Sequence, residues 1–282
     1  MSMTSKQHAV DHLVETLSTK NRIWILTGAG ISAPSGIPTY RDDNRAWQHR
    51  QPIQHDDFVN NLATRKRYWA RSLVGFHYFS KAMPNTGHYS IARIQNAGYV
   101  SGLVTQNVDR LHSEAGARNV IDLHGRLDRV VCLECRNLFS RFDFQKLLEH
   151  SNPNFDQSTK KILPDGDAEL EKTLTSETNI PGCPKCGGVV MPDVVFFGGK
   201  TSEVKVQNCL DSLKDSDCVL VCGSSLSVYS GFRFVKKASE MGLPLLAINK
   251  GLMRGQELFD LVVADACEEI LPRVAEVLDC GY

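Results

Sequence analysis

The feature that most constrains the fold of this chain is a short apolar run that stops at a glycine-containing turn. Residues 22–26 (RIWIL) follow a segment with helical spacing, and the turn Thr27-Gly-Ala-Gly-Ile-Ser32 comes directly after them. An apolar strand that leads into a glycine turn, with a helix start soon after, is typical of units in which helices join parallel strands. This turn therefore predicts an α/β fold with a buried parallel sheet.

Apolar segments and segments of helical periodicity alternate along both ends of the chain. We expect further strands at residues 100–105, 120–123, 189–197, 218–222, 244–248 and 262–263, and helices at 58–79, 206–214, 232–241 and 268–278. With 282 residues, 42% of them hydrophobic, the chain is long enough to bury a sizeable core. The alternation predicts a Rossmann-like, doubly wound parallel sheet with helices on both faces.

Two regions interrupt this alternation. Residues 42–83 are rich in Arg, His, Asn and aromatic side chains, whereas residues 131–188 hold paired cysteines and a polar stretch, 151–178, with little periodicity. We expect both regions to pack together outside the main sheet as a smaller part, helical over about 42–84 and zinc-binding over about 131–188. The sheet part is then built from about 1–41, 85–130 and 189–282.

The charge balance and the hydropathy of the chain argue against several classes of protein. Lys plus Arg and Asp plus Glu each number 32, so the net charge is zero, which argues against nucleic-acid binding driven by phosphate neutralisation. No apolar run reaches the roughly 20 residues that span a bilayer. Asp11 and Glu15 interrupt the N-terminal segment, which does not have the pattern of a signal or transit peptide. We expect a cytoplasmic protein with no nucleic-acid, membrane or obligate protein partner.

Four of the nine cysteines form two C-x-x-C pairs, Cys132 with Cys135 and Cys183 with Cys186. Such pairs in a cytosolic chain indicate a metal site rather than disulfides. Four thiolates complete a tetrahedral zinc shell and leave no open coordination position, so we expect one structural zinc ion. Redox-active dithiols are the alternative interpretation of the same spacing.

The glycine turn by itself leaves two interpretations open, a nucleotide-binding loop and a plain tight turn. Gly28 and Gly30 permit a close approach of the backbone to a pyrophosphate, but the next glycine is Gly36, so the dehydrogenase spacing G-x-G-x-x-G fails. The acidic residue expected about 20 positions later has no clear candidate. Arg41 follows the loop and suits either a phosphate contact or a solvated surface position.

Several motifs in a fixed order give the chain a resemblance that no single motif carries. They are GAGIS at 28–32, GIPTYR at 36–41, TQNVD at 105–109, LHG at 123–125, the two cysteine pairs and GSS at 223–225. From about residue 21 to residue 278 the chain resembles the sirtuins, the family of NAD-dependent protein deacylases. RYWAR at 67–71, PDVVFFG at 192–198 and VYSG at 228–231 are similar to the class II branch, which includes mitochondrial lipoamidase and ADP-ribosyltransferase members and their bacterial relatives.

The resemblance implies an enzyme that consumes NAD and removes acyl groups from lysine, giving nicotinamide, O-acyl-ADP-ribose and free lysine. Such a reaction needs a base near neutral pH, and His124, between a strand and a glycine, suits that role. Without the surrounding motifs, a histidine there is more often structural. Asn107 and Asp109 are expected to contact ribose hydroxyls and the nicotinamide carboxamide, although each also suits a helix N-cap.

The remaining NAD-binding residues that the resemblance implies come from separate turns. They are Gly28, Ala29, Gly30 and Arg41, then Gln106, and on the adenosine side Gly223, Ser224, Ser225, Asn249, Lys250, Gly251 and Cys267. Asn249 is expected to read the adenosine ribose in place of the missing acidic residue. Two departures from the family pattern are Thr39-Tyr40, where aspartate and phenylalanine are usual, and Gly199, where an acidic residue is usual.

Substrate recognition is expected to use two further segments. Val195 and Phe196 belong to a strand that is expected to pair with the backbone of an acyl-lysine protein, and in the family the carbonyl at the position of Val195 bonds the acyl-lysine amide. Tyr68 and Arg71 repeat a spacing that related sirtuins use for acidic acyl groups, and they share one helix face. The alternative is that Arg71 faces solvent. Residues 164–167 (PDGD) are expected to cover the mouth of the pocket.

Two kinds of rival function are compatible with parts of this residue set. A mono-ADP-ribosyltransferase needs the same NAD site but transfers ADP-ribose to protein. A non-catalytic NAD sensor or a zinc-ribbon binding module is disfavoured because His124, Asn107 and Asp109 form a complete set.

Overall fold

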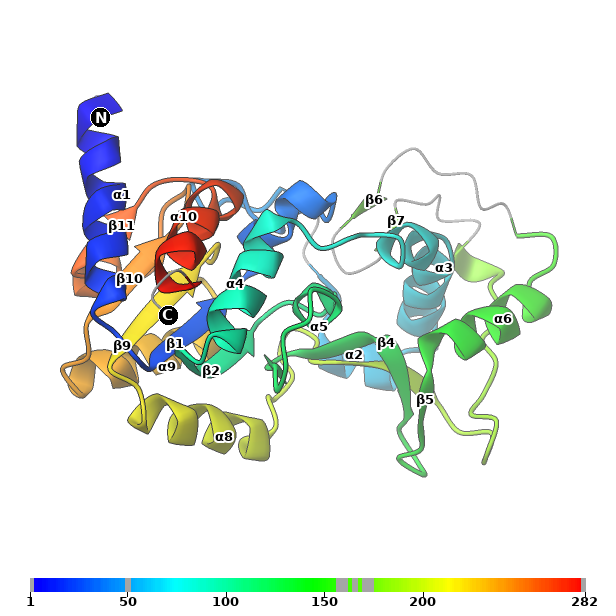
Figure 1. Ribbon diagram of the computed structural model, residues 1–282. Helices are drawn as coiled ribbons and strands as arrows, with labels where there is room; N and C mark the ends of the chain where they lie inside the picture. Colours follow the sequence, from blue (N-terminus) through cyan, green and yellow to red (C-terminus); the bar gives the residue numbers. More distant parts are fainter. Residues whose placement is uncertain (1–2, 49–51, 156–161, 164–166, 169–174, 280–282) are drawn as a thin grey trace.

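The six strands of the larger sheet all run parallel (Figure 1). The computed structural model describes residues 3–48, 52–155, 162–163, 167–168 and 175–279. The strand order is β11-β10-β9-β1-β2-β3, and every neighbouring pair is parallel. These strands are β1 (Ile23–Thr27), β2 (Val100–Thr105), β3 (Ile121–Asp122), β9 (Cys218–Cys222), β10 (Leu245–Ile248) and β11 (Leu261–Val263). The predicted Rossmann-like parallel sheet is therefore confirmed.

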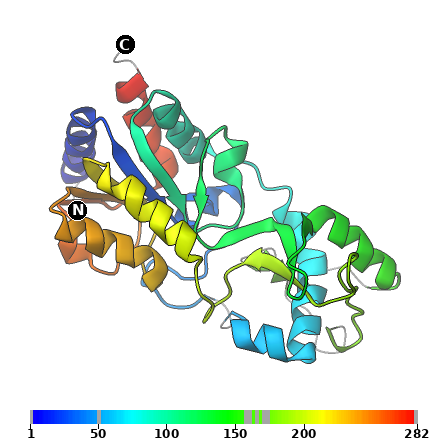
Figure 2. The same cartoon turned by 90° about the horizontal axis from the view of Figure 1, so that it is seen from below.

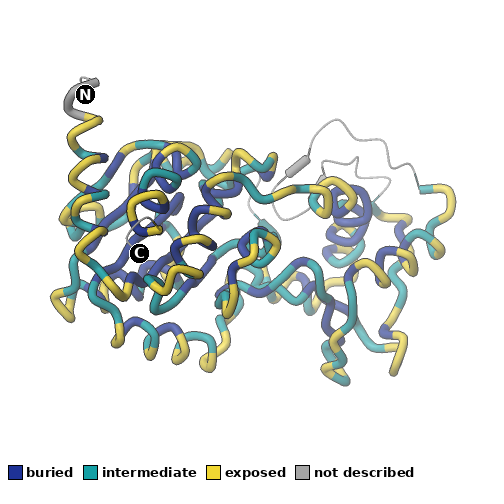
Figure 3. Tube along the Cα trace, viewed as in Figure 1, coloured by how far each residue is buried: buried dark blue, intermediate teal, exposed yellow. Residues whose placement is uncertain are grey.

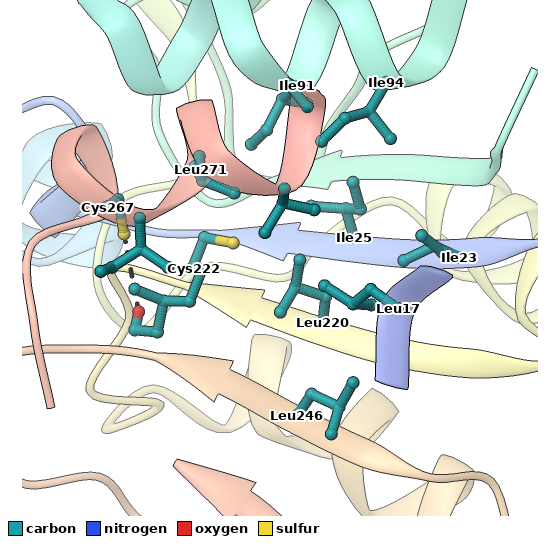
Figure 4. Packing of buried hydrophobic residues seen from close by; sticks show 14 of the residues in the cluster. Leu17, Ile23, Ile25, Ile91, Ile94, Leu220, Cys222, Leu246, Cys267 and Leu271 are labelled. Atoms are coloured by element: carbon teal, nitrogen blue, oxygen red, sulfur yellow. Dashed lines mark hydrogen bonds between the residues drawn. The ribbon is translucent and has the colours of Figure 1, made fainter. Parts of the chain in front are cut away.

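Helices cover both faces of this sheet (Figures 1 and 2). One face carries α1 (Met3–Ser18), α4 (Thr86–Asn96) and α10 (Cys267–Asp279), and the other carries α8 (Glu203–Lys214) and α9 (Tyr229–Glu240). Successive residues of a strand point to opposite faces, so Ile25 packs with the first helix set and Trp24 with the second. Figure 4 shows Ile91 and Leu271 of the first set over β1 and β9. We call this sheet and its five helices the large part.

Burial explains why the central strands are apolar throughout. All five residues of β1 and all five of β9 are buried, because both faces are covered and both edges are paired. Figure 3 shows buried stretches inside the molecule and exposed residues on its outer surface. Among the described residues, no helix combines the length and the apolar character that crossing a bilayer requires.

A second sheet, of three antiparallel strands in the order β5-β4-β8, organises the rest of the molecule. Its strands are β4 (Gly125–Cys132), β5 (Leu138–Ser140) and β8 (Val190–Val194). With α2 (His55–Asn60), α3 (Leu62–Phe79) and α6 (Arg141–Ser151) it encloses an aromatic core that includes Trp69 and Phe144. We call this assembly the small part, and a short hairpin, β6 (Ile162–Leu163) with β7 (Asp167–Ala168), lies against α3.

Several local predictions need correction. The helix expected over 58–79 is two helices, because Asn61 has an extended backbone and its side chain accepts a hydrogen bond from the Thr64 N–H as the N-cap of α3. The strand expected over 189–197 ends at Val194 and pairs with β4 rather than with the parallel sheet. The glycine turn continues into two 3₁₀ turns, Ala29–Ile31 and Ala33–Ser35, instead of an α-helix. The two-part division of the chain remains a prediction: β4 crosses its boundary at residues 130 and 131, and β8 pairs with β4 although it lies in the segment assigned to the sheet part.

Candidate functional site

A single cleft of about 1770 Å³ runs between the two parts of the molecule. Every residue predicted above for NAD, for catalysis or for the acyl-lysine lines it. The sheet explains this gathering, because the carboxyl ends of parallel strands meet at one edge and ligands bind beyond that edge. There β1 leads into Gly28, β2 into Gln106, β9 into Gly223 and β10 into Asn249.

The glycine turn after β1 packs directly on the turn after β9. The Gly28 N–H donates to the Cys222 carbonyl (3.1 Å), and the Gly30 N–H donates to the Gly223 carbonyl (2.8 Å). A Cβ atom on Gly30 would lie 2.8 Å from that carbonyl oxygen, and one on Gly223 would lie 2.4 Å from the Ile31 nitrogen. Both N–H groups thus bond to protein, so the glycines here allow two turns to touch. The approach of Gly28 and Gly30 to a pyrophosphate stays a prediction.

A buried hydroxyl joins the two polar residues that follow β2. Asn107 donates through Nδ2 to Ser32 Oγ (2.9 Å) and to the Gly28 carbonyl (3.1 Å), and Ser32 Oγ donates to Asp109 Oδ2 (2.7 Å). The other Asp109 oxygen accepts from the N–H of Leu111 (2.9 Å), the first residue of α5 (Leu111–Glu114). Burial raises the pKa of Asp109, and the hydrogen bonds from Ser32 and Leu111 oppose that rise.

Two buried histidines support this network from behind. His88 Nε2 lies 3.3 Å from Ser32 Oγ, and His112 Nε2 lies 2.9 Å from Thr27 Oγ1, with the two rings 4.8 Å apart. Burial lowers the pKa of His88 to about 4 and that of His112 well below 6.5. His112 is buried in the core. Ser32 lies inside the GAGIS motif and was within reach of prediction, whereas nothing in the sequence singles out His88.

His124 lies at the carboxyl end of β3, beside the turn after β2. Its Nδ1 is 2.9 Å from the Gln106 carbonyl and its Nε2 is 2.6 Å from Ser230 Oγ. Burial lowers the pKa of His124 to about 4, the bond to the Gln106 carbonyl opposes this, and the charges of Lys205 and Arg233 lower the pKa further. A neutral imidazole that lines a ligand-sized cleft is a candidate proton acceptor. Ser230 was not predicted as a site residue.

The predicted adenosine residues lie around the turns after β9 and β10. Asn249 is buried and donates to the Gly251 carbonyl (2.7 Å), while Lys250 lies 3.7 Å from Glu268. Cys267 begins α10, and its Sγ is 3.5 Å from the Ile248 carbonyl, as Figure 4 shows. On this side of the cleft, the side chains of Asn249 and Lys250 therefore already interact with other groups of the protein.

Arg41 is not a solvated surface residue. It is half-buried, its guanidinium carbon lies 3.8 Å from the centre of the Trp47 ring, and its Nη1 donates to the Arg45 carbonyl (2.7 Å). Trp47 in turn packs edge-on against Phe197, the residue that follows Val195 and Phe196 (ring centres 5.6 Å apart). The arginine loop and the segment after β8 thus share one aromatic cluster.

The segment after β8 forms the wall of the cleft opposite the large sheet. The Val195 N–H donates to the His124 carbonyl (2.7 Å). Phe196 stacks on Phe58 (5.0 Å between ring centres) and meets the Tyr68 ring edge-on (5.3 Å). Tyr68 is buried, and Arg71, one helical turn later, is half-buried and lines the same cleft. Of the expected cover PDGD, residues 164–166 lie outside the described residues.

The four paired cysteines converge at one point of the small part. Their sulfur atoms all lie within 4.8 Å of one another, with Cys132 and Cys186 3.5 Å apart and Cys135 and Cys183 3.8 Å apart. A tetrahedral zinc ion with Zn–S bonds of about 2.3 Å requires sulfur separations of about 3.8 Å. The four thiols therefore fit a zinc ion with a complete, closed shell.

Known proteins share both the sequence and the fold. A sequence profile described as the Sir2 family matches residues 28–230. A Bordetella bronchiseptica protein named NAD-dependent protein deacetylase is 46% identical over 272 residues, covering 96% of this chain and 99% of that protein. A Drosophila melanogaster protein named NAD-dependent protein deacylase Sirt4 is 39% identical, covering 97% of this chain and 92% of that protein. A solved structure of a Sir2 mutant with a p53 peptide and NAD has a TM-score of 0.77 at 25% identity, with 95% and 97% coverage of the two chains.

Proposed function

Because this chain belongs to the Sir2 family and is an NAD-dependent protein deacylase with a structural zinc site, we propose that the cleft between its two parts holds NAD and an acyl-lysine side chain beside His124. The products are nicotinamide, O-acyl-ADP-ribose and the free lysine. The single observation that carries the assignment of residues is the position of a neutral imidazole at the carboxyl edge of the sheet, within the cleft.

His124 is proposed as the base. In the neutral ring, Nδ1 carries the proton that bonds to the Gln106 carbonyl, so Nε2 is left with the lone pair that accepts a proton. A ribose hydroxyl that reaches Nε2 becomes a nucleophile when it gives up its proton there. The low pKa of His124 keeps the base unprotonated at neutral pH.

Asn107 and Asp109 are proposed to orient the reacting sugar and the carboxamide of nicotinamide. Ser32 fixes both side chains, since it accepts from Asn107 and donates to Asp109. Fixed donors and acceptors reduce the reorganisation that the reaction requires. Gly28, Ala29, Gly30, Arg41, Gln106 and the turns at 223–225 and 249–251, with Cys267, are proposed to enclose the rest of the dinucleotide.

The acyl group is proposed to enter beside Val195 and Phe196, toward Tyr68 and Arg71 of α3. These four residues line the end of the cleft that the small part contributes. A guanidinium in a partly buried position favours acyl groups that end in a carboxylate, such as succinyl or glutaryl, over acetyl.

The role of His124 is tested by His124→Ala. We expect turnover of an acyl-lysine peptide to fall by about 10²–10⁴ while NAD binding, measured by calorimetry, is retained. His77→Ala removes an exposed histidine outside the cleft and serves as the matched control, with turnover unchanged. Retained acyl transfer in His124→Ala would refute the assignment.

Mass spectrometry of an acylated protein incubated with NAD separates deacylation from ADP-ribosyl transfer. We expect loss of the acyl mass, whereas a gain of ADP-ribose on the protein would favour the mono-ADP-ribosyltransferase.

A further inference from the structure

The hydroxyl of Ser230 touches the basic nitrogen of His124, and neither the fold nor the proposed function explains why. Ser230 lies in the first turn of α9, is half-buried and lines the cleft. Its Oγ is 2.6 Å from His124 Nε2, which is the shorter of the two hydrogen bonds of that ring.

The direction of this hydrogen bond follows from the other side of the ring. His124 Nδ1 faces the carbonyl oxygen of Gln106 at 2.9 Å, and a carbonyl only accepts, so Nδ1 carries the proton. In a neutral imidazole Nε2 then has a lone pair and no proton. The Ser230 hydroxyl must therefore be the donor, and it occupies the lone pair that a base needs.

Helix formation does not account for a serine at this position. Serine near a helix start usually caps backbone N–H groups, but the N-cap of α9 is Val228 and no side chain caps this end. Among the hydrogen bonds of the described residues, the Ser230 hydroxyl has one partner, the imidazole. The Ser230 side chain therefore interacts with His124 and not with the backbone at the helix start.

We propose that Ser230 is a positioning residue, which holds Nε2 of His124 unprotonated and directed into the cleft until a ribose hydroxyl takes the same place. When the ribose hydroxyl arrives, the Ser230 hydroxyl rotates away and the new donor bonds to the same lone pair. This inference rests on the proposed role of His124 as the base.

The charges around His124 act in the same direction as Ser230. The positive charges of Lys205 in α8 and Arg233 in α9 lower the pKa of His124 and so disfavour a second positive charge there. Asp122, two residues before His124, does not offset them, because it is engaged by Arg110 (2.6 Å). The positive end of α9 adds to this effect. The hydroxyl that donates to Nε2 stabilises the neutral ring further. Removal of this hydroxyl should therefore raise the pKa of His124.

Ser230→Ala tests this arrangement, with Ser230→Thr to restore the hydroxyl and Ser239→Ala, at the far end of α9, as the matched control. The pH dependence of kcat/KM reports the free enzyme. We expect Ser230→Ala to raise the pKa of the acidic limb by about 0.5 to 1, the equivalent of one hydrogen bond. Ser230→Thr and Ser239→Ala should follow the unaltered protein.

A spectroscopic measurement makes the test independent of activity. The ¹⁵N resonance of His124 Nε2, observed at pH 7.5 in histidine-labelled protein, reports whether a donor bonds to that nitrogen. We expect it to move in Ser230→Ala and to keep its position in Ser230→Thr.

Two results would overturn the inference. One is a Ser230→Ala variant whose acidic limb and Nε2 resonance match those of the unaltered protein. The other is an equal loss of kcat/KM at every pH, which indicates a structural role alone. If His124→Ala itself retains turnover, the base assignment has failed instead, so the two failures are distinguishable.

Discussion

The large part and the small part of the molecule are stabilised in different ways. Among the described residues, the parallel sheet lies between two clusters of buried residues, 23 on one face and 16 on the other. The described residues of the small part form one cluster of 13, and two of these, Cys132 and Cys183, belong to the four-cysteine site. Burial of apolar surface stabilises the large part, whereas we expect the small part to depend on bound zinc in addition.

This difference in stabilisation corresponds to a division of the cleft residues between the two parts. Ser32, Asn107 and Asp109 follow β1 and β2, which are paired on both edges, and His124 follows β3, the edge strand beside β2. Tyr68, Arg71 and Phe196 belong to the side that zinc supports. The large part thus holds the proposed base, and the small part supplies the wall that is proposed to contact the acyl group.

Loss of zinc is the change expected to have the largest effect on the structure of the small part relative to the large part. A structural zinc site contributes on the order of 10 kcal/mol, so Cys183→Ser should lose the metal and the tertiary structure of the small part. Metal analysis and peptide-level hydrogen exchange measure both. We expect exchange protection to disappear over α3 and β4 and to persist over β1 and β9.

Cys209→Ser is the matched control, since Cys209 is fully buried in the large part. A hydroxyl placed there should lower the free energy of unfolding by about 1–3 kcal/mol without loss of zinc. A Cys183→Ser variant that keeps native protection over α3 would remove the contrast between the two parts.

Acid should weaken the large part through His88. Its pKa is lowered from 6.5 to about 4 in the folded state, so below pH 6.5 the unfolded chain binds more protons than the folded one. Stability is therefore complete above pH 6.5 and falls as the pH drops toward 4. Between pH 7 and pH 4.5 this single group should lower the free energy of unfolding by about 2 kcal/mol.

His88→Gln isolates that contribution. His88 is the third residue of α4 and forms a capping box with Asn85, a position that glutamine also fills. Denaturant unfolding at both pH values should show an acid-induced loss about 2 kcal/mol smaller than that of the unaltered protein. An identical loss in the variant would place the acid sensitivity elsewhere.

A further expected effect, which leaves the fold intact, concerns acyl selection by the small part. Arg71→Ala should lower kcat/KM for a succinyl-lysine peptide about tenfold or more, since a charge-assisted hydrogen bond contributes roughly 1.5–3 kcal/mol. Acetyl-lysine turnover should change little. Lys66→Ala, which removes a neighbouring cation of α3 that also lines the cleft, tests whether the effect is specific to Arg71. Equal losses for both acyl groups would show that Arg71 supports the pocket without selecting its ligand.

Much of the architecture was predictable because it depends on local sequence patterns. Apolar runs such as those ending at Thr27 and Thr105 become parallel strands, and the strand ends place Asn107, His124 and Gly223 at one edge. The cysteine spacing likewise predicts a four-sulfur site that the structure brings together. Predictions failed where a local pattern has two outcomes, as at residues 189–197, whose apolar character suits either sheet.

The sequence by itself determined the class of fold, the zinc ligands and the strand ends that carry the site, because these depend on periodicity and on short spacing. Only the tertiary structure decided which polar groups bond to each other. The Gly28 and Gly30 N–H groups bond to another turn, Ser32 joins Asn107 to Asp109, and Ser230 meets His124 across 106 residues of chain. Such pairs depend on the packing of separate strands and helices, and a buried donor finds its partner through space, wherever that partner lies in the chain.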